Sequence, residues 1–297
     1  MANKRVLVKR RKAVRNIRKI TRTMQLIATA RFQAAMTRAT ASKPYAEKLA
    51  ELVADLSESA EQISHPLMET HEDVKRSILL IITSMRGLCG GYNAGVLRTA
   101  MGHLDSQENK GVESDVHMVG KKGVGYFRFL KRSMAEQITH IGEVPSFEDT
   151  EPIANGFMDR FSKGEVASVH VAYMRFLSAG RQRPTVIQLL PLVQDRSADA
   201  DAGEQQEPKG PKADFEFSPE PAELLGDLLP ATVRVRLLQC FNDATVSEHI
   251  ARMVAMKAAT DAAEDMITML SRKYNRARQT QITMELLDIV GGADALS

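Results

Sequence analysis

The residues that come closest to a chemical site lie in the glycine-rich stretch SMRGLCGGYNAG, residues 84–95. This stretch follows an apolar run and precedes a helical pattern, which is where α/β proteins often bind phosphate on backbone amides. A phosphate loop of the nucleotide-hydrolysing kind requires Lys and then Ser or Thr after its last glycine, and Tyr92 and Asn93 follow here instead. A second run, VGKKGVG at 119–125, lacks the GxGxxG spacing. We therefore predict that both runs form tight turns that need glycine, and that the chain holds no cofactor.

The other reactive side chains do not form a recognisable catalytic or metal-binding set. Cys89 and Cys240 lie far apart, without CxxC spacing or a histidine cluster, which argues against a metal site or a disulfide framework and favours a reducing compartment. The seven histidines are scattered, and His249 fits a helix interface. Paired carboxylates such as Glu264 and Asp265 fit a solvated helix surface. We predict no catalytic residue and no metal, so the chain is not expected to be an enzyme.

Two long helices are predicted at the ends of the chain, and they would set the positions of the residues between them. Residues 1–60 contain no glycine and only Pro44, and good helix formers dominate from about residue 3 onwards. One helix of this length would reach about 80 Å and would have to project from a compact domain of this size. The helical pattern returns over residues 231–290, and the glycine pair at 291 and 292 is expected to end it.

Each long helix carries a narrow apolar stripe. In the N-terminal helix apolar residues recur in alternating steps of four and three, at Ala13, Ile17, Ile20, Met24 and Ile27. The C-terminal helix follows similar steps, with Val246, Ile250, Met253, Met256, Ala263, Met266, Leu270, Tyr274 and Ala277. Two helices of similar length with such stripes favour an antiparallel coiled coil. Ordinary core helices of a bundle are the alternative, although the middle of the chain is too small to cover both helices along their whole length.

The middle of the chain, residues 75–193, alternates short apolar runs with helical stretches. The runs cover 76–84, 115–120, 165–176 and 184–192, and the helical stretches cover 94–105 and 150–163. This alternation predicts a Rossmann-like α/β domain with a mostly parallel sheet. Residues 194–214 are polar, acidic and poor in core-forming side chains, which predicts a disordered loop. Residues 215–230 are assigned to a connector.

Charge is distributed unevenly along the chain. Residues 1–46 hold thirteen of the 40 Lys and Arg residues and none of the 37 Asp and Glu residues. Such a block could meet phosphates, acidic lipid headgroups or an acidic protein surface, and charge alone does not choose among them. The longest aliphatic run, ILLII at 78–82, is far too short to span a membrane. No apolar segment typical of a signal peptide follows the basic start, so a cytoplasmic location is expected.

Three segments closely resemble the gamma subunit of F-type ATP synthases. They are RNIRKITRTMQLIATARFQAA near the N-terminus, SMRGLCGGYN with VGKKGVGYF in the middle, and SEHIARMVAMKAATDAAEDMITMLSRKYNRARQTQITMELLDIVGGADAL at the C-terminus. They lie in the family's order, and the resemblance spans essentially the whole chain. It implies a central stalk that rotates inside a hexamer of alpha and beta subunits, whose beta subunits carry the catalytic sites. The α/β domain would touch the epsilon subunit and the membrane c-subunit ring.

The resemblance also implies how this subunit works and which residues contact its partners. The stalk couples transmembrane ion flow to ATP synthesis or hydrolysis at the cytoplasmic face of the cell inner membrane. Lys19, Arg22 and Met24 would meet acidic loops of the beta subunits, and Arg278 and Gln279 match positions that hydrogen-bond a beta loop. Thr283 and Glu285 match nearby positions that affect coupling. On this interpretation the apolar stripe of the N-terminal helix meets the other helix, and its charge meets the ring.

The sequence departs from the family pattern at two places. Met85 stands where the family usually has an aspartate before Arg86, which puts in doubt any charge pair between those two positions. The acidic segment 194–214 lies where chloroplast relatives carry a regulatory cysteine pair, and it contains no cysteine. A thiol switch of that kind is therefore not expected here.

Two other classes of protein fit the basic N-terminal helix less well. An RNA-binding coiled-coil arm should carry aromatic stacking residues among its basic ones, and the first 44 residues offer only Phe32. A helix lying on an anionic membrane should carry a bulky apolar face, whereas Ala13, Ala28 and Ala34 make this face shallow. We therefore expect no nucleic acid partner, and contact with the membrane only through the complex.

Overall fold

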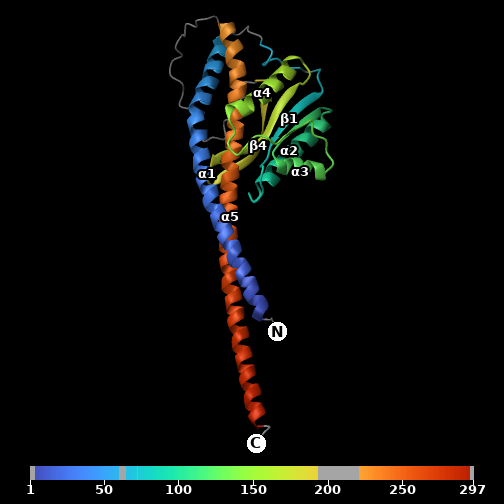
Figure 1. Ribbon diagram of the computed structural model, residues 1–297. Helices are drawn as coiled ribbons and strands as arrows, with labels where there is room; N and C mark the ends of the chain where they lie inside the picture. The colour runs from blue at the N-terminus through green and yellow to red at the C-terminus, as the bar shows by residue number, and fades with distance from the viewer. Residues whose placement is uncertain (1–3, 60–64, 72, 193–220, 295–297) are drawn as a thin grey trace. The chain divides into compact units, whose positions relative to one another are not determined.

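The computed structural model describes residues 4–59, 65–71, 73–192 and 221–294 (Figure 1). Two compact units are present, one made of residues 31–251 and the other of residues 1–30 and 252–297. The acidic segment 194–214 lies outside the described residues. Among the residues described, no helix combines the length and the apolar character needed to cross a bilayer.

Two long helices account for the ends of the chain, as predicted. Helix α1 spans Lys4–Ser59 and continues through Pro44, and helix α5 spans Pro221–Asp294. α5 differs from the prediction at both of its ends, because it includes residues 221–230 of the expected connector and does not stop at Gly291. Its first turns pack into a core cluster through Leu225, Leu229, Val233 and Leu237. This burial offsets the backbone hydrogen bond that Pro230 cannot donate.

The middle of the chain forms a five-stranded sheet in the order β3-β2-β1-β4-β5. β1 pairs in parallel with β2 and with β4, and β2 pairs in parallel with β3, whereas β4 and β5 are antiparallel. This confirms the predicted mostly parallel sheet. The strands are β1 (Arg76–Ile82), β2 (Glu113–Val119), β3 (Glu136–Ile138), β4 (Ser168–Ser178) and β5 (Arg181–Leu190).

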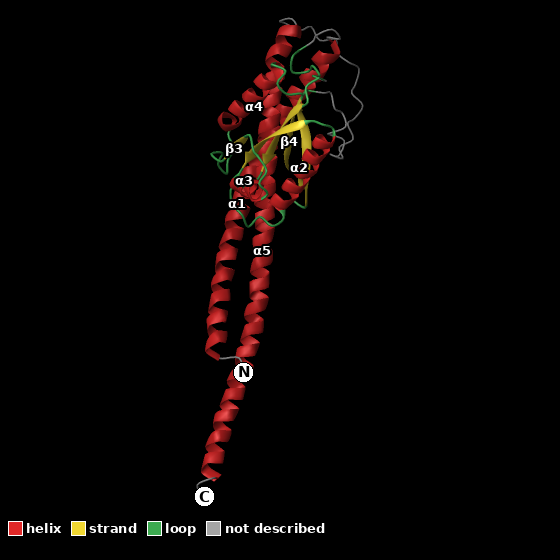
Figure 2. Cartoon of the chain, turned by 90° about the vertical axis from the view of Figure 1, so that its right-hand side faces the viewer, coloured by secondary structure: helices red, strands yellow, loops and turns green. Residues whose placement is uncertain are grey.

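Three shorter helices pack on the two faces of this sheet (Figure 2). They are α2 (Tyr92–Asn109), α3 (Lys121–Phe129) and α4 (Phe147–Ser162). Alternate residues of β1 enter opposite cores: Ile78 and Leu80 pack with α4 and the start of α5, whereas Leu79 and Ile81 pack with α2 and α3. β1 is therefore buried on both faces, which explains its uninterrupted aliphatic run.

The sequence prediction missed β3 and α3. β3 has only three residues, too few to show a strand pattern. The start of α3 carries the run GKKG, which was expected to form only a tight turn. Gly120 does adopt a positive φ of 94°, but Gly123 lies inside the helix, where an added Cβ would collide with the sulfur of Met118 and the hydroxyl of Thr83. Glycine is needed there because α3 approaches the sheet closely.

The buried stripe of α1 differs from the predicted one. Ile17, Ile20 and Ile27 are 52%, 59% and 47% exposed, and Ala13 is also exposed. The buried row of α1 lies one position further on and repeats in multiples of seven, at Leu7, Thr21, Ala28, Ala35 and Leu49, and Ala39 is buried one turn after Ala35. Both rows repeat every seven residues, so the period alone could not distinguish them. Small side chains occupy the buried row because they let two helices approach closely.

Within residues 31–251 the helix pair has a compact core in which alanines of α1 face β-branched side chains of α5. Ala35 and Ala39 of α1 pack with Val246 and Ile250 of α5. In α5 the predicted stripe is largely confirmed, since these two residues are buried together with Met256, Ala263 and Leu270, whereas Met266 is 46% exposed.

The corrected position of the seam can be tested at two adjacent alanines. We expect Ala35→Leu to lower the free energy of unfolding of the full chain by about 1 to 3 kcal/mol, because the added methylenes overpack a seam in which Ala35 is 3% exposed. Ala34 is exposed, so Ala34→Leu should change the free energy of unfolding by less than about 0.5 kcal/mol. Urea unfolding followed by circular dichroism measures both. Equal effects of the two substitutions would contradict the assigned seam.

Candidate partner-contact surface of the helix pair

Residues 4–30 and 252–294 form an antiparallel helix pair with polar contacts along its seam. Arg18 forms an ion pair with Glu264 at 2.9 Å between Nη1 and Oε1. The guanidinium of Arg11 lies over the ring of Tyr274, 5.0 Å from its centroid. Earlier residues of α1 therefore meet later residues of α5, which confirms the predicted antiparallel arrangement.

A pair of threonines lies inside this seam. The hydroxyls of Thr21 and Thr260 are 2.8 Å apart, and both residues are buried. The Thr21 hydroxyl lies 3.1 Å from the carbonyl of Arg18, to which it can donate while accepting from Thr260. Each buried hydroxyl is thus satisfied, which makes the polar pair compatible with a close helix contact.

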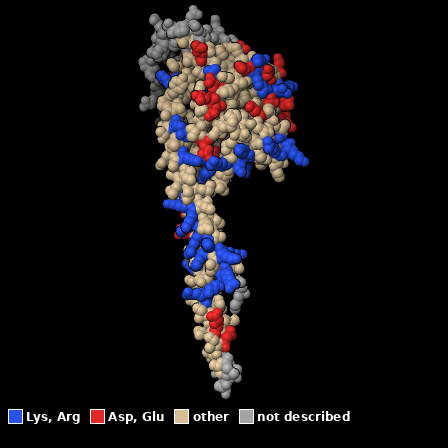
Figure 3. Space-filling model, viewed as in Figure 1, with Lys and Arg blue, Asp and Glu red and all other residues tan. Residues whose placement is uncertain are grey.

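The predicted contact residues of α1 lie on its outer surface. Lys19 and Arg22 are exposed, Met24 is half-buried, and the Arg22 guanidinium donates to the Gln25 side chain at 3.1 Å. Lys and Arg side chains gather over this part of the helix pair in Figure 3. Four large apolar side chains are exposed on the same stretch of α1, namely Ile17, Ile20, Leu26 and Ile27. The outer surface is therefore both cationic and apolar, rather than cationic alone as the sequence suggested.

The predicted contact residues of α5 form a separate group. Arg278, Gln279, Thr283 and Glu285 are all exposed. The Thr283 hydroxyl donates to the Gln279 carbonyl at 3.0 Å, and the Gln281 amide donates to the Glu285 carboxylate at 2.8 Å. Arg278 lies about 20 Å further along α5 than Glu264, the partner of Arg18, at a rise of about 1.5 Å per residue. The structure thus places the seven predicted contact residues in two groups at different levels of the helix pair.

The end of α5 carries an apolar surface that the sequence reasoning did not identify. Six large apolar side chains there are between 48% and 68% exposed: Ile282, Met284, Leu286, Leu287, Ile289 and Val290. At 3.6 residues per turn they cover more than half of the helix circumference, which is wider than the stripe of an ordinary surface helix and typical of an interaction surface. The sequence of residues 282–290 already indicates this surface, because six of these nine residues are large and apolar and they do not follow one narrow stripe.

The glycine-rich stretch after β1 forms a self-contained hydrogen-bonded turn. The Asn93 carboxamide accepts from the Ser84 backbone N–H at 3.0 Å and donates to the Cys89 sulfur at 3.1 Å. The Thr83 hydroxyl donates to the Val119 carbonyl at 2.6 Å and accepts from the Gly123 N–H at 3.0 Å. These groups bind one another and fasten the β1 and β2 ends together, which supports the structural interpretation of both glycine runs.

A half-buried polar network joins α1 and α5 within residues 31–251. The Ser42 hydroxyl donates to the Gln239 carboxamide oxygen at 3.2 Å, and the Gln239 amide donates to Asp243 Oδ1 at 2.9 Å. Burial raises the pKa of Asp243 to about 6, against the opposing effects of Gln239 and of Arg175. Burial also raises the pKa of the nearby Cys240 thiol to about 12, so this thiol stays protonated at neutral pH.

The raised pKa of Asp243 predicts a pH dependence of stability. A carboxyl group with a higher pKa in the folded chain than its unfolded value of about 3.9 favours folding below pH 3.9, and this contribution is lost as the pH rises through about 6. Asp243→Asn removes this titration. We therefore expect the difference in melting temperature, Asp243→Asn minus wild type, to increase by about 2 to 4 °C when the pH is raised from 4 to 7.

The matched control is Asp159→Asn, because Asp159 is an exposed residue of α4. Thermal unfolding of the full chain at a series of pH values measures the three proteins. A constant difference between wild type and Asp243→Asn across this range would show that Asp243 does not titrate as described.

Comparison with known proteins places these features in a family. The family model described as ATP synthase matches residues 3–296. The ATP synthase gamma chain of Rhodopirellula baltica is 42% identical over 298 residues, which cover 100% of this chain and 99% of the relative. The ATP synthase gamma chain of Leptospira biflexa is 38% identical over 297 residues, which cover 100% of both chains.

Two solved structures share the fold at lower identity. A chain of the Euglena gracilis mitochondrial ATP synthase rotor matches with a TM-score of 0.63 and 18% identity, over 94% of this chain and 98% of that one. A chain of the Tetrahymena thermophila central stalk and c ring matches with a TM-score of 0.57 and 21% identity, over 81% and 99%. The resemblance seen in the sequence is thus confirmed, and the chain belongs to the family of ATP synthase gamma chains.

Proposed function

We propose that this chain is the central rotor of an F-type ATP synthase, which couples transmembrane ion flow to ATP synthesis or hydrolysis by turning inside the hexamer of alpha and beta subunits. Its membership of the gamma chain family, with both helices and the α/β domain retained, carries this proposal. The chain would work at the cytoplasmic face of the cell inner membrane. Its α/β domain would contact the epsilon subunit and the c-subunit ring.

The asymmetry of a two-helix rotor explains how one chain can control three equivalent catalytic subunits. A pair of helices has no threefold symmetry, so it presents a different surface to each beta subunit at any angle. Nucleotide affinity at the three sites then differs because each site is biased by a different contact. Rotation exchanges these contacts in turn.

The exposed side chains of residues 4–30 and 252–294 support the proposal that a partner encloses this helix pair. Exposed Lys19 and Arg22 would attract acidic loops of the beta subunits from several ångströms away. The adjacent Ile17 and Ile20 give such a surface an apolar component, which attracts without imposing a single hydrogen-bonded geometry. The exposed apolar end of α5 would pack against the hexamer interior, with Arg278 and Gln279 hydrogen-bonding one beta loop.

An RNA-binding role is not favoured by any observation on the described residues. Phe32, the one aromatic residue among the first 44, packs beside Ala35 and Val246 in the helix seam. It is therefore not presented for stacking on a base, which sequence-tolerant RNA binding needs.

Substitution of Met24 tests the contact between α1 and the beta subunits. A lysine there would extend a further cation from a half-buried position towards acidic loops, and a pair of unit charges about 4 Å apart near a protein surface is worth up to about 4 kcal/mol before screening. This would deepen one angular position of the rotor. We expect Met24→Lys to assemble and hydrolyse ATP while ion pumping falls up to about tenfold relative to hydrolysis.

ATPase rate and pumping are measured on the same membrane vesicles, with Met24→Leu as the uncharged control. Raised ionic strength should partly restore pumping, because a solvent-accessible charge is screened. An unchanged ratio of pumping to hydrolysis in Met24→Lys would mean that Met24 does not face the hexamer.

The chain itself is proposed to be non-catalytic, with the nucleotide sites on the beta subunits. The hydrogen bonds within the glycine-rich stretches support this, because Thr83 and Asn93 are engaged by their own chain. Calorimetric titration of the purified full chain with MgATP is expected to give no binding at micromolar concentrations. Stoichiometric binding to the chain alone would contradict the proposal.

A further inference from the structure

One carboxylate in residues 31–251 contacts cationic side chains from two separate elements. Glu143 lies in the loop between β3 and α4. Its Oε2 pairs with Nη1 of Arg31 in α1, and its Oε1 lies 3.3 Å from Nη1 of Arg86 in the loop after β1. The Glu143 side chain is 29% exposed, whereas those of Arg31 and Arg86 are 42% and 73% exposed. The carboxylate is thus the most enclosed member of the group.

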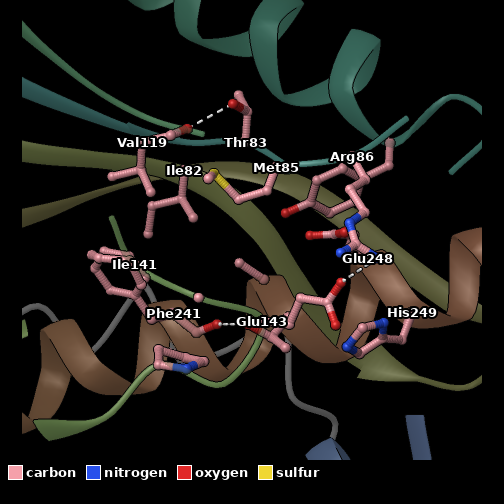
Figure 4. A pocket seen from close by; sticks show the side chains of 15 residues that line it. Ile82, Thr83, Met85, Arg86, Val119, Ile141, Glu143, Phe241, Glu248 and His249 are labelled. Carbon is pink, nitrogen blue, oxygen red and sulfur yellow. Dashed lines mark hydrogen bonds and ion pairs between the residues drawn. The ribbon is translucent and has the colours of Figure 1, made fainter. Parts of the chain in front are cut away.

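The topology explains why these residues meet. β1 and β3 both run parallel to β2, so the loops that follow them lie at the same edge of the sheet. Arg86 comes from the first loop and Glu143 from the second, and α1 supplies Arg31. In Figure 4 the Glu143 carboxylate lies beside the Arg86 guanidinium, in a small cavity that Phe241 and His249 of α5 also line. This cavity is where the sheet edge meets α5.

The contact between Arg86 and Glu143 joins two different loops of the α/β domain. The residue before Arg86 is Met85, so the adjacent side chain offers Arg86 no charge. Glu143 supplies the carboxylate from a different loop instead. The consequence is that Arg86 shares this carboxylate with α1, which links two loops of the α/β domain to a helix of the rotor.

We propose that Glu143 is a positioning residue that fastens α1 to the carboxyl edge of the sheet and thereby transmits torque between the α/β domain and the helix pair. This role rests on the proposed rotor function. Removing the charge would take away the anion that the Arg31 and Arg86 guanidiniums share. Each partly exposed ion pair is weak, but two pairs that share one carboxylate act on the same contact.

The local contact is tested first, on the purified full chain and without reference to rotation. Amide hydrogen exchange is compared for wild type, Glu143→Gln and Glu148→Gln, where Glu148 is an exposed residue of α4 with the same charge. We expect Glu143→Gln to accelerate exchange about two- to tenfold in residues 84–91 and 139–146, the range expected for losing two partly exposed ion pairs. Glu148→Gln should leave both loops unchanged. Unchanged exchange in Glu143→Gln would overturn the proposal.

The role in torque transmission is tested next, in the assembled ATP synthase on membrane vesicles. The ratio of ion pumping to ATP hydrolysis should fall about two- to fivefold in Glu143→Gln and stay at the wild-type value in Glu148→Gln. Faster exchange with an unchanged ratio would overturn the assigned role while leaving the rotor function intact. Absence of coupled pumping in the complex with the wild-type chain would instead contradict the rotor function itself.

Discussion

Close packing of two antiparallel helices through small side chains is the constraint on which the rest of this structure depends. In residues 31–251 the seam uses Ala35 and Ala39 against Val246 and Ile250, and in the other unit Thr21 meets Thr260. Because mainly small residues of α1 occupy the seam, its isoleucines and its cationic side chains remain outside it. The inner surface of the pair is thus reserved for its own stability, and the outer surface is available to partners.

The α/β domain shows the same dependence on close approach. Gly123 lets α3 pack against Met118 and Thr83. The polar groups after β1 form hydrogen bonds that hold the strand ends together. What resembles a phosphate loop in sequence is therefore a structural device. Glu143 then connects this domain to α1 through Arg31, while it also pairs with Arg86. Asp243 of α5 is linked to α1 through Gln239 and Ser42.

Much of the fold could be predicted from the sequence, because helix length, strand periodicity and the alternation of the two are local signals. The side of α1 that is buried could not, since Ile20 and Thr21 belong to adjacent rows with the same seven-residue period. Hydrophobicity favours the isoleucine row, whereas close helix packing favours the threonine and alanine row. The start of α5 was also missed, because burial of Leu225 and Leu229 against the sheet is a tertiary effect that Pro230 obscures in the sequence. The contact residues, in contrast, were named by family resemblance, and the structure adds their exposure and their separation into two groups.

The most direct test of the central claim is to watch the chain turn. Phe129, at the end of α3, is 82% exposed, so a cysteine placed there can carry a probe without disturbing the core, while Cys89 and Cys240 are buried. With the alpha–beta hexamer fixed to a surface, single-molecule recording after addition of MgATP should show rotation of the probe in one direction, in three equal steps per turn that follow the threefold arrangement of the beta subunits. A probe that stays fixed relative to the hexamer while ATP is hydrolysed at the normal rate would contradict the account.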